Sequence, residues 1–390
     1  MNKKMIKLTI FSLALLTVMA GAAVSPALGS IAANFPDVDK SLIKMILTVP
    51  SLCIIPVALI SGRLTRIFTK RKVLLFGLLI YVIGGVGGGM VNNIYALLAF
   101  RAILGIGVGM IVPLSTSVVS DFYEGIERVR TMGQVTANNN LGGIISLVGS
   151  GLLASIGWRY SFGIYLLGIV SFFLVLIFFP SYTEPEEPKK SDGHFGGIFY
   201  FLALAMFFLM VLFYSVPTNM ALYIQLKNIG ESQITGVVMG TNTLTAFFAG
   251  IFFVQMRNLF KGITVAVMLF VMGGGILIMG LADSLAVLIA GNAFMGFGLG
   301  SLMPSIFMRV TKVVKPVQTV SAMAVISSML YLGQFASPII LDNISVIFGD
   351  GSISFIYQFV GITMLLISIV FFCVLFSRYY AQGKKSYSNQ

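Results

Sequence analysis

The chain alternates long apolar segments with short polar ones. Twelve segments hold about 20 largely apolar residues each, which is the length that an α-helix needs to cross a bilayer. They are expected at residues 8–33, 41–65, 73–92, 95–120, 131–155, 158–180, 196–225, 232–256, 262–282, 286–310, 317–341 and 353–377. Inside lipid the backbone must satisfy its own hydrogen bonds, so each segment is predicted to be helical. The pattern therefore predicts an all-α polytopic membrane protein with twelve transmembrane helices.

The composition agrees with that pattern. Of the 390 residues, 57% are hydrophobic and only 10% are charged, and the mean hydropathy is +0.98. Soluble domains carry about 25% charged residues. No water-soluble fold would bury this much apolar surface, so the chain is expected in a membrane.

The amino-terminal segment has two interpretations. Lys3, Lys4 and Lys7 precede an apolar run and small residues near Ala22, as in a cleavable signal peptide. Because eleven more apolar segments follow, we favour an uncleaved first transmembrane helix.

The distribution of Lys and Arg predicts the orientation. If both termini face the cytoplasm, twenty of these residues fall on that side and four on the other, namely Lys40, Lys44, Arg159 and Lys227. Short cytoplasmic loops collect Lys and Arg, so we expect a multi-pass protein of the cell membrane with both termini inside. The net charge of +12 then reflects this bias and contact with anionic lipids, and no nucleic-acid partner is expected.

A polar interval divides the chain into two halves. Residues 181–195 carry Glu, Lys and Pro and read as a cytoplasmic linker between a six-helix bundle at 1–180 and another at 196–390. A shift of 191 positions aligns the halves without a gap. It places Leu97, Ala99, Ala102, Gly105, Gly107, Gly109 and Pro113 on Leu288, Ala290, Ala293, Gly296, Gly298, Gly300 and Pro304, and Gly84 and Gly89 on Gly275 and Gly280. The halves are therefore predicted to be pseudo-symmetric, with a substrate site between them.

The loop after the second apolar segment resembles a motif of the major facilitator superfamily. Gly62, Leu64, Lys70 and Arg71 match the basic pattern, whereas Arg66 stands at the acidic position and Thr69 at a glycine position. The resemblance implies a cytoplasmic gating loop formed by these residues, with Asp121 and Arg128 at the end of the fourth segment as neighbours.

The fourth and fifth segments extend the resemblance over the chain. Arg101, Gly105, Gly107 and Gly109 match the superfamily's motif in the fourth helix, with Leu104 in place of a glutamine. Gly133, Gly142 and Gly151 resemble the spaced glycines of its twelve-helix drug:proton antiporter branch, although Ser146, Leu147 and Ser150 depart from that pattern. The resemblance implies alternating access between two bundles.

Arg101 is the one formal charge well inside a predicted span. A charge there is costly unless it faces water or a partner. Two interpretations remain open: Arg101 faces a substrate cavity, with its repeat equivalent Asn292 opposite, or it forms structural bonds to backbone carbonyls.

Neutral polar side chains within the spans are the other candidates for substrate binding. They are Asn138, Asn139, Tyr214, Asn219, Asn242, Asn292 and Gln334. Hydrogen bonding between helices is the alternative role for each. All thirteen acidic residues fall at predicted helix ends or in loops, so a proton site is expected only near the outer rim, at Asp37, Asp39 or Asp342.

We therefore expect a secondary active transporter that exports a small lipophilic compound or drug, with protons as a candidate coupling ion. The alternative is an importer or facilitator of a small polar or anionic solute. A non-transporting membrane sensor or scaffold would be expected to carry a soluble output domain, which these residues do not include. No catalytic or metal-ligand cluster appears, so the protein is expected to be no enzyme, to need no cofactor and to act as a monomer.

Overall fold

The computed structural model describes residues 3–181, 194–315 and 318–387. Within these ranges it contains helices and no strands, and twelve of its helical spans are long and apolar enough to cross a membrane. The predicted fold class is confirmed in this part of the chain. The contacts between residues define two compact units, Met1–Gly240 with Val313–Leu341, and Thr241–Lys312 with Asp342–Gln390.

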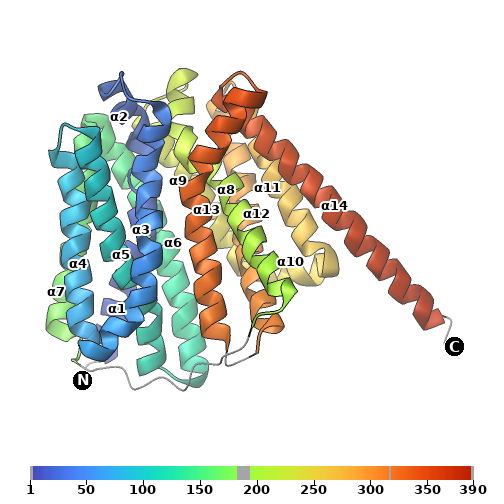
Figure 1. Ribbon diagram of the computed structural model, residues 1–390, viewed down its shortest axis with the longest axis horizontal. Helices are drawn as coiled ribbons and strands as arrows, with labels where there is room; N and C mark the ends of the chain where they lie inside the picture. The colour runs from blue at the N-terminus through green and yellow to red at the C-terminus, as the bar shows by residue number, and fades with distance from the viewer. Residues whose placement is uncertain (1–2, 182–193, 316–317, 388–390) are drawn as a thin grey trace. The chain divides into compact units, whose positions relative to one another are not determined.

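The helices follow one another in the order of the predicted spans (Figure 1). The α-helices are α1 (Lys3–Ala22), α2 (Leu28–Asn34), α3 (Lys40–Ile67), α4 (Lys70–Gly87), α5 (Ile94–Phe122), α6 (Gly125–Ile156), α7 (Leu167–Phe178), α8 (Gly197–Leu226), α9 (Ser232–Ile251), α10 (Phe253–Phe260), α11 (Thr264–Gly280), α12 (Leu285–Val313), α13 (Thr319–Phe348) and α14 (Ile353–Tyr387). Short 3-10 helices lie at η1 (Ser25–Ala27), η2 (Gly88–Met90), η3 (Trp158–Leu166) and η4 (Lys261–Ile263).

Three boundaries differ from the sequence prediction. The first span breaks at η1, where Pro26 lacks a backbone N–H, and continues as α2. The predicted eighth span ended at residue 256, but α9 ends at Ile251 and α10 opens the ninth span. Helix α13 continues to Phe348, so Asp342, predicted just beyond the span, lies within the helix six residues before its end.

Glycines let neighbouring helices approach in equivalent ways in the two halves. A Cβ on Gly105 of α5 would lie 2.5 Å from the carbonyl oxygen of Pro50 on α3, and one on Gly296 of α12 would lie 2.2 Å from that of Asn242 on α9. Two residues further along the same helices, Gly107 packs on Gly77 of α4 and Gly298 packs on Met268 of α11. Small residues permit this approach where lipid supplies no hydrophobic drive. Each contact lies within one compact unit, and the pairs match the repeat shift.

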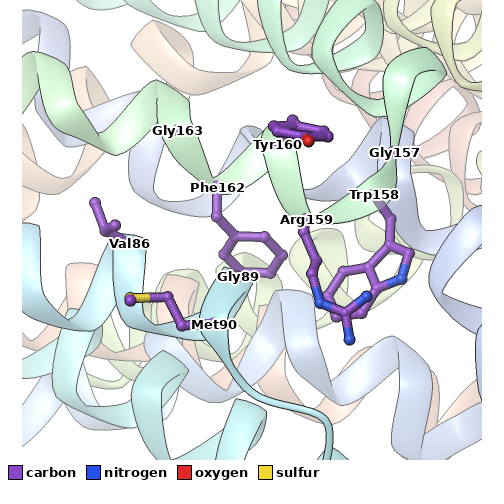
Figure 2. A pocket seen from close by; sticks show the side chains of 9 residues that line it. All are labelled: Val86, Gly89, Met90, Gly157, Trp158, Arg159, Tyr160, Phe162 and Gly163. Atoms are coloured by element: carbon purple, nitrogen blue, oxygen red, sulfur yellow. The ribbon is translucent and has the colours of Figure 1, made fainter.

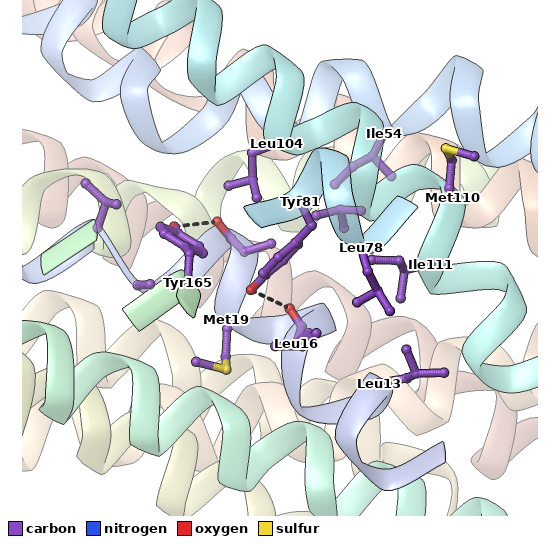
Figure 3. Close-up of a cluster of buried hydrophobic side chains, with 14 of the residues drawn as sticks. Leu13, Leu16, Met19, Ile54, Leu78, Tyr81, Leu104, Met110, Ile111 and Tyr165 are labelled. Atoms are coloured by element: carbon purple, nitrogen blue, oxygen red, sulfur yellow. Dashed lines mark hydrogen bonds between the residues drawn. The ribbon is translucent and has the colours of Figure 1, made fainter. Parts of the chain in front are cut away.

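Two tyrosines anchor the buried core of the first half. Tyr81 of α4 and Tyr165 of η3 are fully buried, and their rings meet edge to face with centroids 5.7 Å apart. The Tyr81 hydroxyl lies 3.5 Å from the carbonyl oxygen of Leu16, and the Tyr165 hydroxyl donates to the carbonyl of Ala20 at 3.2 Å (Figure 3). Both acceptors belong to α1, so the two rings tie α4 and η3 to the first helix.

Candidate functional site

Arg101 lies at the centre of a hydrogen-bonded cluster that joins four elements. Its side chain is fully buried in α5. Its Nε donates to the carbonyl of Ile46 on α3 at 2.8 Å, its Nη2 to the carbonyl of Ala20 on α1 at 2.9 Å, and its Nη1 to the Tyr165 hydroxyl at 2.6 Å. The guanidinium carbon also lies 5.5 Å from the centroid of the Tyr165 ring.

The carbonyls that accept from Arg101 are those that the helices leave without a donor. Pro50 lies inside α3 and has no N–H to offer the carbonyl four positions earlier, which is that of Ile46. Ala20 lies in the last turn of α1, where carbonyls lose their helical partners. Its oxygen accepts from both Arg101 and Tyr165. The nearby carbonyl of Ala23 accepts from the Ser150 hydroxyl of α6. Buried side chains thus satisfy the backbone carbonyls at the end of α1 and one turn before Pro50 of α3.

The structure therefore favours the second interpretation of Arg101, a set of structural bonds to backbone carbonyls. The guanidinium exposes no surface, and its bonds go to protein groups. Its repeat equivalent Asn292 is likewise fully buried, within the other compact unit. A direct contact of Arg101 with substrate stays a prediction that this geometry does not support.

The predicted gating loop contains an ion pair with one buried partner. Lys70, the first residue of α4, is fully buried, and its Nζ lies 2.7 Å from Oδ2 of Asp121 near the end of α5. The same Nζ lies 3.3 Å from the Ser117 hydroxyl. Because a buried ammonium is costly without a partner, the Asp121 carboxylate holds the start of α4 against the end of α5.

The other residues of the predicted gating loop differ in burial and in contacts. Arg71 donates to the carbonyl of Leu176 and, at 3.5 Å, to the Ser181 hydroxyl, which joins α4 to the end of α7. Gly62 and Arg128 are exposed and Leu64 is half-buried. The backbone of Arg66 belongs to α3, but its side chain lies outside the described residues.

The candidate binding residues of the first compact unit fall into two groups. Asn138, Asn139 and Gln334 are half-buried: Asn138 donates to the carbonyl of Gln134, Asn139 accepts from the Thr17 hydroxyl at 3.1 Å, and Gln334 accepts from the Ser51 hydroxyl at 2.8 Å. Tyr214 and Asn219 on α8 are buried. The Asn219 amide nitrogen donates to the carbonyl of Ser215 at 2.8 Å, while its oxygen has no hydrogen-bond partner among the described residues.

In the second compact unit the structure brings two candidates together. Asn242 on α9 and Asn292 on α12 are both buried, and the Asn242 amide nitrogen lies 3.5 Å from the carbonyl oxygen of Asn292. This contact joins two helices of the second half. Their role in binding a substrate stays a prediction.

Sequence reasoning missed a set of contacts that joins the two halves of the chain inside the first compact unit. The Ser25 hydroxyl of η1 donates to the carbonyl of Pro217 on α8 at 2.6 Å, and the Ser30 and Ser232 hydroxyls of α2 and α9 lie 2.9 Å apart. A Cβ on Gly236 of α9 would lie 2.5 Å from the carbonyl oxygen of Leu147 on α6. An isolated serine or glycine in an apolar span does not predict which helix it contacts. The sequence therefore offered no sign of these contacts beyond the presence of small residues.

Comparison with known proteins assigns the class of molecule. A family model described as Major Facilitator Superfamily matches residues 10–338. Multidrug resistance protein 3 of Bacillus subtilis (strain 168) is 28% identical over 186 residues, which are 47% of this chain and 35% of that protein. The multidrug transporter protein MdtP of the same organism is 32% identical over 123 residues, 31% of this chain and 22% of that protein. The matched segments thus span well under half the length of these relatives.

Solved structures agree on the fold. The POT family transporter PepTSo superposes with a TM-score of 0.76 at 14% sequence identity, over 98% of this chain and 99% of that one. That likeness shows the fold of a multi-pass membrane protein, and the family match above identifies a class of transporters rather than enzymes. The chain belongs to the Major Facilitator Superfamily.

We predict that Arg101→Ala unfolds at a clearly lower temperature in detergent solution. The change removes a charged donor from two buried carbonyls and from Tyr165, a loss on the order of 3 kcal/mol. Tyr165→Phe, which removes one hydroxyl from the same cluster, should cost about 1 kcal/mol. An Arg101→Ala protein with the wild-type unfolding midpoint and no transport would instead place Arg101 in the transport mechanism itself.

We predict that Asp121→Asn destabilises the protein by about 3 kcal/mol, since it removes the carboxylate 2.7 Å from the buried Lys70 ammonium. The double variant Lys70→Met with Asp121→Asn should recover most of that loss, and thermal unfolding of Lys70→Met, Asp121→Asn and the double variant measures the coupling. Glu127→Gln, an exposed carboxylate on the next helix, serves as the control. Additive effects of the two single changes would show that the pair contributes nothing.

Proposed function

We propose that the protein exports small lipophilic compounds, drugs among them, across the cell membrane by alternating access between its two halves. The observation that carries this proposal is the set of contacts between the halves in the first compact unit. These contacts join η1 and α2 to α8 and α9, α6 to α9, and α3 to α13.

The contacts between the halves that are named above are made by uncharged groups. They consist of hydrogen bonds from serine hydroxyls and of close contacts at glycines. Gly151 and Gly236, for example, each lie against backbone atoms of the facing helix. The side chain of Gln225 on α8, in the amide orientation that satisfies it, adds bonds to Gly29 and Ser30 of α2. A neutral hydrogen bond contributes only about 1 kcal/mol net. Such an interface can separate and reform, which alternating access requires.

The type of substrate is inferred from the neutral polar side chains and from the relatives. The half-buried side chains of Asn138, Asn139 and Gln334 offer amide groups. Among the described residues, their hydrogen-bond partners are a backbone carbonyl and two hydroxyls and not carboxylates. The two Bacillus subtilis relatives carry multidrug names. Both observations support an uncharged or weakly charged lipophilic substrate. The alternative importer of anionic solutes relied on Arg101, whose guanidinium is bonded to protein groups.

Coupling to protons would have to use a residue near a helix end. Among the described spans, Asp342 lies deepest of the carboxylates, six residues inside the end of α13, whereas Asp121 and Glu127 lie in terminal turns. A carboxylate at such depth can load and release a proton from the aqueous side. We therefore propose Asp342 as the coupling site if export is driven by protons.

Retention of lipophilic fluorescent dyes in a pump-deficient bacterium tests the proposal. Cells that express the protein should retain several-fold less dye than vector controls, and a protonophore should abolish the difference. Gly236→Leu should be inactive because its side chain would meet the backbone of α6, whereas Gly250→Leu on the same helix, where a Cβ has open space, should remain active.

Each result of the dye experiment bears on a different part of the proposal. Asp342→Asn should abolish protonophore-sensitive export, and wild-type export in that variant would exclude Asp342 as the coupling site. Equal retention with and without the protein, at matched membrane expression, would contradict export of such compounds.

A further inference from the structure

A cavity of about 540 Å³ opens beside the ends of α4 and α6. It is lined by Val86, Gly89 and Met90 from the end of α4 and η2, and by Gly157, Trp158, Arg159, Tyr160, Phe162 and Gly163 around η3. These elements are the ends of the spans Lys70–Met90 and Trp158–Phe178, so the cavity lies where the spans meet the membrane surface. Neither the family nor the proposed transport mechanism assigns it a role.

One side of the cavity is cationic and aromatic. The Arg159 guanidinium carbon lies 4.3 Å from the centroid of the Trp158 ring, and Arg159 donates one hydrogen bond to the Asn92 side chain. Figure 2 shows the guanidinium and the indole side by side at one wall. Among the described residues Arg159 forms no ion pair with a carboxylate. Its remaining N–H groups and its full charge are therefore available to an anion.

The opposite side of the cavity is apolar. Val86 and Met90 face the Phe162 ring across from Arg159 (Figure 2). The apolar side chain of Met90 is 80% exposed, and the amphipathic side chain of Tyr160 is 61% exposed. An apolar wall beside a cation, at the end of a membrane span, complements a molecule with an anionic head and a hydrocarbon body. An anionic phospholipid is a molecule of that kind, and on the predicted orientation it would lie in the leaflet away from the cytoplasm.

We propose that this cavity binds an anionic phospholipid, with its phosphate on Arg159 and its upper acyl chain against Val86, Met90 and Phe162. Arginine recognises phosphate through paired N–H groups, and the indole beneath the guanidinium fixes its plane. Trp158 and Tyr160 belong to the residue types that settle at the level of lipid headgroups. Close packing holds this geometry, because a Cβ on Gly89 would lie 2.8 Å from the carbonyl oxygen of Arg159.

The single tryptophan of the chain, Trp158, lies in the cavity and reports on its occupancy. The test measures quenching of its fluorescence in the full-length protein, reconstituted with brominated phosphatidylglycerol or with brominated phosphatidylcholine carrying the same acyl chains. We expect the anionic lipid to be preferred about fivefold at equal mole fraction, as for one cation at a membrane surface. Equal quenching by the two lipids would overturn the proposal.

Two variants and a matched control test whether the preference for the anionic lipid arises at this cavity. Arg159→Gln should abolish it, and so should Met90→Asp, which places a negative charge at the rim through an exposed side chain and keeps the test valid if Arg159→Gln fails to fold. Lys227→Gln should leave it intact, although Lys227 is also a cation over an aromatic ring, 5.9 Å from the centroid of Tyr223. A preference that survives Met90→Asp would contradict the proposal. Loss of the preference on addition of millimolar inorganic phosphate would point to a free anion and overturn the assignment to lipid.

Discussion

The buried guanidinium of Arg101 is the interaction on which the first half of the molecule depends. Helix α1 ends where η1 begins, and α3 contains Pro50, so both helices leave carbonyls without helical donors. In lipid no water can satisfy such groups. Arg101 and Tyr165 supply the donors, so the same two residues satisfy these carbonyls and join four elements.

The contacts described above differ in strength. Charged groups, Arg101 in the membrane and Lys70 with Asp121 at the helix ends, join helices within one half. Serine hydroxyls and glycines join helices of different halves, as at Ser25 with Pro217 and at Gly236 with Leu147. Breaking the first kind costs several kcal/mol and breaking the second far less. This difference is what a transporter that keeps its halves intact while separating them would need.

The fold was largely predictable, and the partners of the candidate residues were not. Span positions depend on local hydropathy, which the sequence carries directly, and the repeat shift of Gly105 onto Gly296 appears again in equivalent packing. The charge at Arg101 drew attention from sequence, and Pro50 marks the Ile46 carbonyl as one without a helical donor, but no residue pattern shows that the Arg101 side chain reaches it. Asp342 was misplaced relative to its helix because polar Asn343 and Ser345 obscure where α13 ends.

A crosslink between the halves tests the central claim most directly. The Ser30 and Ser232 hydroxyls lie 2.9 Å apart, so Ser30→Cys with Ser232→Cys, in a protein whose Cys53 and Cys373 are replaced by alanine, should form a disulfide on oxidation. We predict that the oxidised protein loses dye export and that a reducing agent restores it, because the two halves must separate at this contact in each cycle. Undiminished export by fully crosslinked protein would contradict alternating access at this interface.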